Sequence, residues 1–216
     1  MKRLMAAICF MTLCYVGTAM ADYSATVSQD VTLESISGTY AGTSLYAGYS
    51  STYGIENAIL LYNQPSIPAG QTITDVTLNF DVWSLPSGSH PLTVSSNPNI
   101  TWTPSSVTYA NFGNANDSLI SQIANPAVQW YSVDVTSYVL SQLASGNNAF
   151  TFVIGTADES QLSTSAYYGI ESDRYSGGIY ASYLDYQTAA VPVPGALWLL
   201  GPGLAGLVGL KRKYIG

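Results

Sequence analysis

Short segments in which apolar and polar residues alternate recur through the middle of this 216-residue chain. The clearest is Thr74–Trp83, where every second residue is apolar: Val76, Leu78, Phe80 and Val82. Successive side chains of a β-strand point to opposite faces, so such a segment has one apolar face to bury. The pattern predicts an all-β domain.

Eight further segments show strand-like patterns between turn-forming residues: Tyr23–Leu33, Thr43–Tyr49, Ala58–Tyr62, Pro91–Ser95, Tyr131–Val135, Ala149–Gly155, Ala166–Ile170 and Ile179–Tyr186. About nine strands with hairpin-length connections predict a jelly-roll β-sandwich. A parallel β-helix is the structural alternative, but the chain has no fixed short repeat that would support it.

One short helix is also predicted. Thr136 or Ser137 is suited to cap its start, and Gly146 is suited to end it. Its expected apolar stripe is Val139, Leu140 and Leu143.

The N-terminus has the pattern of a secretory signal peptide, predicted as a helix over residues 1–21. Lys2 and Arg3 precede an apolar stretch, and Ala19 and Ala21 are the small residues that a signal peptidase recognises. Cleavage is therefore expected after Ala21. A short membrane anchor is the alternative, although the apolar stretch is brief for a span of about 20 residues.

The two cysteines, Cys9 and Cys14, both lie within this segment. A mature protein would have none, which excludes disulfides, zinc–thiolate sites and a cysteine nucleophile.

Charge is distributed very unevenly along the chain. Residues 22–190 contain one basic residue, Arg174, and all thirteen acidic residues, which gives the segment a formal charge of −12. Such a surface repels phosphate backbones and other polyanions, so nucleic acid is excluded as a partner.

The C-terminus contains twenty uncharged residues, from Val191 to Leu210, followed by a basic cluster. As a helix, this stretch would be about 30 Å long, enough to cross a hydrocarbon core, with the cluster left on the cytoplasmic side. A simple membrane tail anchor is one interpretation.

A more specific interpretation rests on the order proline pair, apolar span and basic end. The residues concerned are Pro192, Val193, Pro194, Lys211, Arg212 and Lys213. The tail, residues 189–216, resembles the PEP-CTERM sorting signal, with Val193 in place of the glutamate of the type motif. The resemblance implies recognition by an exosortase in the inner membrane of a Gram-negative bacterium that makes an exopolysaccharide. The protein would be anchored transiently and then released to the cell surface or beyond.

Residues 22–188 resemble a DNRLRE-type domain. The segments that carry the resemblance are Leu45–Tyr49, Asn57–Tyr62, Ile67–Leu78, Trp102–Tyr109, Val133–Thr136, Leu143–Asn148 and Tyr168–Ser172. The family implies a jelly-roll sandwich related to carbohydrate-binding modules. The arginine usual in the strand matching Asn57–Tyr62 is missing, and Arg174 is the one basic residue of the segment. The alginate binding of some relatives is therefore not carried over.

Aromatic side chains are the candidate binding residues, because sugar rings stack well on indole and phenol rings. Trp83 falls on the polar face of its strand and is the best candidate for an exposed ring, followed by Tyr175. Trp102 and Trp130 are expected in the core or at its rim, since large aromatics are mostly buried.

Oxygen-rich loops are candidates for one structural calcium ion, the single cofactor considered. The favoured loop contains Asn116 and Asp117, with Asn114 beside them. Asp158–Glu159, and Glu171 with Asp173, are further options, and a solvated acidic surface is the simpler interpretation.

No catalytic constellation can be named. His90 is the single histidine, no G-x-S-x-G motif is present, and nothing marks a pair of carboxylates. The chain is expected to be a non-enzymatic surface protein. It would either bind neutral exopolysaccharide or serve as a structural matrix component that makes protein contacts.

Overall fold

A computed structural model describes residues 20–88, 90–113, 116–157 and 164–191. Most of these residues form strands: β1 (Met20–Glu34), β2 (Gly38–Tyr40), β3 (Ser44–Ser50), β4 (Gly54–Asn63), β5 (Gln71–Ser84), β6 (Leu92–Asn97), β7 (Ser118–Ile123), β8 (Gln129–Asp134), β9 (Ala149–Thr156), β10 (Ala166–Glu171) and β11 (Tyr183–Ala190). The helices are α2 (Tyr109–Phe112), α3 (Thr136–Ala144) and the 3-10 helix η3 (Tyr175–Gly178). The predicted all-β class is confirmed.

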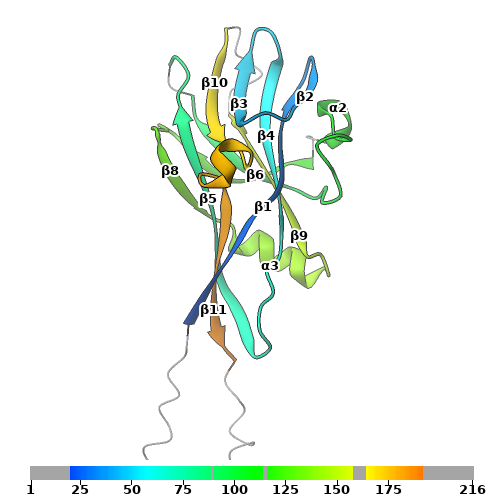
Figure 1. The fold of residues 1–216 in the computed structure, drawn as a ribbon, viewed down its shortest axis with the longest axis vertical. Coiled ribbons are helices and arrows are strands. Elements are labelled where there is room, and N and C mark those ends of the chain that lie inside the picture. Colours follow the sequence, from blue (N-terminus) through cyan, green and yellow to red (C-terminus); the bar gives the residue numbers. More distant parts are fainter. Residues whose placement is uncertain (1–19, 89, 114–115, 158–163, 192–216) are drawn as a thin grey trace, which may run out of the picture.

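Antiparallel pairing joins six strands into a closed circuit, in the order β1, β11, β5, β10, β3 and β4, with β4 pairing back to β1. From β4 the sheet continues through β9 and β6 to β7, while β2 adds to β1 and β8 adds to β5. Figure 1 shows the elongated body that results.

The main hydrophobic core takes its side chains from the strands of this circuit and from β6, β8, β9 and α3. Its largest buried side chains include Tyr62, Phe80, Phe152, Tyr168 and Tyr186. The apolar face of β5 lies here, as its alternation predicts.

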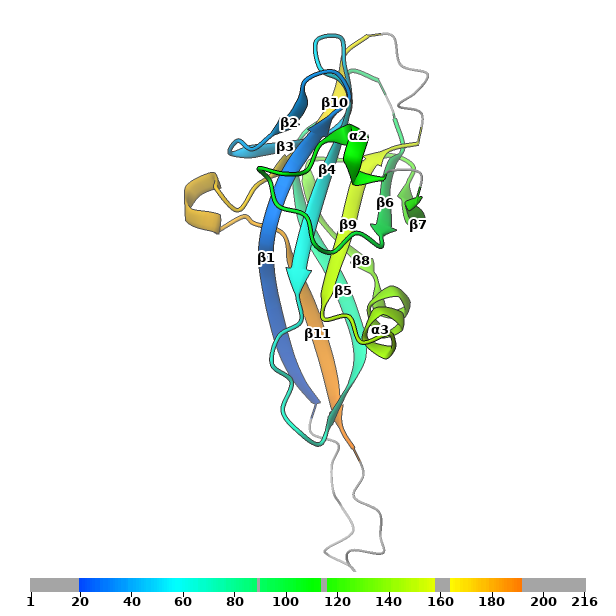
Figure 2. The same ribbon diagram turned by 90° about the vertical axis from the view of Figure 1, so that its right-hand side faces the viewer.

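A second, smaller core lies on the opposite side of β1, β4 and β9. Trp102 and Val107, from the segment leading into α2, and Phe112 of α2 pack over Val31 and Ile59. Figure 2 shows α2 in front of these strands. Strand β4 is therefore buried on both faces, which explains why its segment Ala58–Tyr62 is continuously apolar rather than alternating.

All nine expected strands are present, with differences at the edges. β2 and β7 are additional, because both are short or polar and give little alternation. The last strand begins at Tyr183 rather than Ile179, which is 69% exposed beside η3.

The predicted helix is α3, but its expected cap is wrong. Neither Thr136 nor Ser137 caps it: Val135 is the N-cap residue, and the Asp134 carboxylate accepts a hydrogen bond from the Thr136 amide at 2.9 Å. Leu140 is 39% exposed and does not belong to the apolar stripe, whereas Val139 is fully buried.

Both ends of the described chain lie at the same end of the domain. Met20 pairs with Ala189, and β1 then runs to Glu34 at the opposite end (Figure 1). Among the described residues, no helix has the length and apolar character to cross a membrane. The predicted signal helix and C-terminal span fall almost wholly on residues 1–19 and 192–216, outside the described part of the chain.

Candidate functional site

A surface pocket of about 290 Å³ lies at the end of the domain remote from the chain ends. It is lined by hydroxyl, carboxyl and aromatic side chains: Glu34, Ser37, Tyr40, Tyr46, Ser50, Tyr53, Glu56 and Tyr167. We call it the tyrosine pocket.

Two tight turns bring these residues together. After β1 the chain reverses into β2, which pairs back with residues 32–34 and carries Tyr40. The β3–β4 turn presents Tyr53, with the Ser50 hydroxyl accepting hydrogen bonds from the amides of Thr52 and Tyr53. Gly54 closes this turn at φ +80°, and a methyl group there would lie 2.1 Å from the Ser35 hydroxyl oxygen. Glycine is therefore required where the two turns meet.

The two carboxyl groups of the pocket come from neighbouring strands. Glu34 and Glu56 stand directly opposite each other in the β1–β4 register, and both are at least 95% buried. The Ser37 hydroxyl donates to Glu34. Burial, and secondarily the charge of Glu34, raise the pKa of Glu56 to about 7. Near neutral pH one of these carboxyls can therefore donate a hydrogen bond while the other accepts.

Three tyrosine rings form a contiguous series along the pocket. Tyr46 lies between Tyr40 and Tyr167, with ring centroids 5.8 Å and 5.3 Å away. The interplanar angles are 37° and 75°, so the rings are tilted rather than coplanar. Aromatic faces beside carboxyl and hydroxyl groups can contact a ligand that has both apolar faces and hydroxyls.

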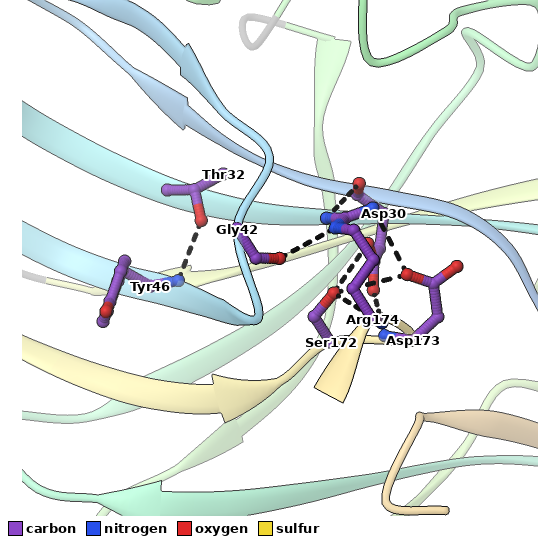
Figure 3. A network of polar contacts seen from close by, with 7 residues as sticks. All are labelled: Asp30, Thr32, Gly42, Tyr46, Ser172, Asp173 and Arg174. Atoms are coloured by element: carbon purple, nitrogen blue, oxygen red, sulfur yellow. Dashed lines mark hydrogen bonds and ion pairs between the residues drawn. The ribbon is translucent and has the colours of Figure 1, made fainter. Parts of the chain in front are cut away.

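The Arg174 side chain is committed to a separate polar network (Figure 3). Its guanidinium lies 2.6 Å from the buried Asp30 carboxylate and also donates to the Gly42 carbonyl at 2.8 Å. Ser172 and the amide of Asp173 donate to the same carboxylate. Arg174 is the one lysine or arginine among the described residues, so this part of the chain keeps no free guanidinium or ammonium for an anionic ligand.

The sequence model of carbohydrate-binding module family 96 matches residues 21–174 of this chain. The chain belongs to carbohydrate-binding module family 96. The match covers β1 to β10 and therefore every residue of the tyrosine pocket. No curated protein matches the chain.

Membership of this family confirms the expectation of a module related to carbohydrate-binding proteins. Modules of this kind are non-catalytic, in agreement with the expectation that the chain is not an enzyme. His90 lies in a loop, where its carbonyl accepts a hydrogen bond from the Tyr168 hydroxyl.

The aromatic residues singled out from the sequence have different environments in the family 96 module. Trp83 is 41% exposed, in keeping with its place on the polar face of β5. Trp102 is buried and donates to Thr151, as expected of a core residue. The core or rim position expected for Trp130 is wrong: it lies on edge strand β8 and is 42% exposed.

Tyr175 belongs to a different cluster from Trp83. It lies in η3, is 39% exposed, and its ring is 6.1 Å from that of Tyr180. The structure thus does not bring the two predicted stacking residues into one ring cluster.

One of the two residues favoured for calcium makes an internal side-chain contact. The Asp117 carboxylate accepts from the Asn97 amide group, and the backbone amide of Asn116 donates to the Gly113 carbonyl. Within the described ranges, no three His, Cys, Asp or Glu side chains gather as metal ligands. Asn114, Asp158 and Glu159 lie outside these ranges, and Asp173 pairs with Arg174. The calcium site stays a prediction.

The processing residues are largely outside the described chain. Ala21 lies in β1 opposite Thr188, whereas Ala19, the proline pair and the basic end all fall on residues without a described position. Signal cleavage and exosortase sorting stay predictions.

Sequence reasoning missed the tyrosine pocket. Its members are spread from Glu34 to Tyr167, and each one alone resembles an ordinary strand or turn residue. One available signal was Glu56, a charged residue two positions before the apolar run Ala58–Tyr62 of β4.

Proposed function

We propose that this family 96 module is an exported, non-catalytic protein that binds a neutral polysaccharide through the tyrosine pocket. The observation that carries the proposal is the combination of four tyrosines with two opposed, buried glutamates in one pocket. Tyrosine rings offer faces for the C–H groups of a sugar, and carboxyls and hydroxyls exchange hydrogen bonds with its hydroxyl groups.

The charges support a neutral ligand. Glu34 and Glu56 would repel a uronate or sulfate group, because two buried acids side by side make the pocket negative above neutral pH. Arg174, which could have offset this charge, neutralises Asp30 instead.

The proposed setting is the surface of a Gram-negative cell that makes exopolysaccharide. Signal peptidase would cleave after Ala21, and an exosortase would act at Pro192–Pro194 after transient anchoring of the tail in the inner membrane. The chain enters and leaves the domain at the end opposite the pocket. That end is about 45 Å from the pocket, the length of the fifteen residues of β1. On a jelly-roll framework attached at those ends, the pocket would face away from the membrane.

Processing can be tested separately from binding. Intact-mass analysis of the protein from its native host is expected to show a species that begins at Asp22 and lacks the tail after Val191. A mature species that still ends at Gly216 would contradict exosortase processing.

The rival function is a structural matrix component that makes only protein contacts. Edge strand β7, with its 59% exposed Leu119, is the feature that favours it. This rival predicts no affinity for any glycan.

Affinity electrophoresis separates the two functions. We expect the purified full-length chain to be retarded in native gels containing a neutral glucan, mannan or galactan. Tyr46→Ala and Tyr167→Ala should each weaken retardation about three- to tenfold, the effect of losing one aromatic contact. The matched control is Tyr180→Ala, which removes from the Tyr175 cluster a ring about as exposed as that of Tyr167.

Three outcomes would contradict this proposal. Equal mobility in all gels supports the structural rival. Loss of retardation in Tyr180→Ala alone assigns binding to the Tyr175 cluster. Retardation mainly by alginate refutes the charge argument.

A further inference from the structure

A second group of aromatic side chains lies on the sheet beside the tyrosine pocket. It consists of the exposed Trp83 and Trp130 and the half-buried Tyr183, and we call it the aromatic patch. Trp130 of β8 stands opposite Asp81, and Tyr183 of β11 stands opposite Asn79 on the other side of β5. Their ring centroids are nevertheless 5.8 Å apart, so the two rings reach toward each other across β5.

The aromatic patch and the tyrosine pocket share one sheet face and meet at Gly169. Gly169 of β10 pairs with Tyr46 on one side and with Ser84 on the other. The indole of Trp83 covers this glycine so closely that a methyl group there would lie 2.5 Å from a ring carbon. Tyr167, two residues along the same strand and therefore on the same face, lines the pocket.

Acidic and polar groups lie between the rings. Asp81 and Glu171 are close enough for the charge of Asp81, after burial, to raise the pKa of Glu171. One Glu171 carboxyl oxygen, Oε2, is buried without a hydrogen-bond partner in the described structure. The junction between patch and pocket therefore suits a ligand with hydroxyl donors and no negative charge.

We propose that the module binds a single neutral polysaccharide chain across its strands, with the tyrosine pocket and the aromatic patch contacting different units of that chain. This inference rests on the proposed function and specifies its ligand class. From β3 through β10 and β5 to β8 the face spans about 14 Å, three strand spacings. A single sugar ring cannot bridge that distance, whereas a short chain can.

The tilt of the rings distinguishes a single chain from an insoluble surface. The Tyr46–Tyr167 and Trp130–Tyr183 pairs are inclined by 75° and 51°. A flat crystalline surface needs coplanar rings, while a flexible chain can turn its successive units to meet tilted ones.

The experiment compares chain lengths on variants of the full-length protein. The probes are the neutral polysaccharide that retards the parent protein most, and size-graded oligosaccharides prepared from it. Trp130→Ala should weaken polymer binding about three- to tenfold while leaving binding of two-unit oligosaccharides unchanged. Tyr46→Ala should weaken both, and the control Leu119→Ala should change neither. Pull-down on crystalline cellulose should recover no protein.

Thermal unfolding of each variant shows whether it remains folded, and Trp130→Leu, which fills space without an aromatic ring, replaces Trp130→Ala if that variant does not fold. Polymer binding equal to the parent in folded Trp130→Ala or Trp130→Leu, alongside loss in Tyr46→Ala, would overturn the two-contact ligand and leave the proposed function intact. Strong binding to crystalline cellulose would overturn the single chain. Absence of retardation for the parent in every gel would overturn the proposed function and this inference together.

Discussion

Strand β1 holds two buried acidic residues, four positions apart, in opposite electrostatic situations. Asp30 faces the Arg174 guanidinium and accepts further hydrogen bonds from Ser172 and Asp173. Glu34 faces a second carboxyl group, Glu56, and receives a hydrogen bond from Ser37. One group is electrically matched, and the other is placed beside a like charge.

The comparison separates a structural acid from a functional one. Burial of a carboxylate is costly unless a cation or several donors compensate it, and Asp30 has both. The Glu34–Glu56 pair places two carboxyl groups side by side in the lining of the tyrosine pocket, so it weakens the fold at high pH. Acids held in an unfavourable setting cluster at binding sites, which is why we assign the pair to ligand contact.

Removing the guanidinium should have the largest effect. Arg174→Ala leaves the fully buried Asp30 without its cation and is expected to lower the free energy of unfolding by about 3 kcal/mol. Urea denaturation at pH 7 measures this loss. Arg174→Lys should recover part of it, because a lysine retains the charge but cannot bond to Asp30 and Gly42 together. A loss below about 1 kcal/mol in Arg174→Ala would show that the Arg174 guanidinium does not compensate the buried charge of Asp30.

Replacing Glu56 is expected to change the free energy of unfolding in the opposite direction, so that the variant is more stable than the parent at high pH. Folding raises the pKa of Glu56 from 4.5 to about 7, so its protonation stabilises the fold at low pH, and this stabilisation disappears as the pH rises through 7. Glu56→Gln carries no such dependence. Relative to the parent, it should therefore gain about 2 kcal/mol of stability between pH 5 and pH 8.

Denaturation of both proteins at the two pH values measures this gain. Burial also raises the pKa of Asp30, to about 6, but this contribution is common to both proteins and cancels. If the difference in stability between Glu56→Gln and the parent stays constant with pH, Glu56 is charged throughout. The Glu34–Glu56 pair would then not differ from Asp30 in the way we describe.

Two serine-to-alanine substitutions, one beside Asp30 and one beside Glu34, are expected to have the smallest effects on stability. Ser172→Ala removes a fully buried donor to Asp30 and should cost about 1.5 kcal/mol, whereas Ser37→Ala removes an exposed donor to Glu34 and should cost about 0.5 kcal/mol. Thermal unfolding at pH 7 ranks the two variants. A larger loss in Ser37→Ala would reverse the assignment of the structural and functional acids.

Local sequence patterns predicted the central strands of the sheet well and the edge strands poorly. The alternation of Thr74–Trp83 placed β5 and its buried face, because a half-buried strand leaves a direct imprint on its residues. β2 and β7 were missed because short edge strands need no apolar face. Trp130 was misplaced because edge strand β8 puts alternate side chains on an open face, where a tryptophan stays exposed.

The sequence by itself determined the all-β class, the surplus of negative charge, the single internal arginine and the exposure of Trp83. Each follows from composition or from the period of a single segment. Only the tertiary structure decided that Arg174 neutralises Asp30 and that Glu34 faces Glu56. It also decided that Tyr40, Tyr46 and Tyr167 share a pocket, because these contacts depend on strand register between segments up to 144 positions apart.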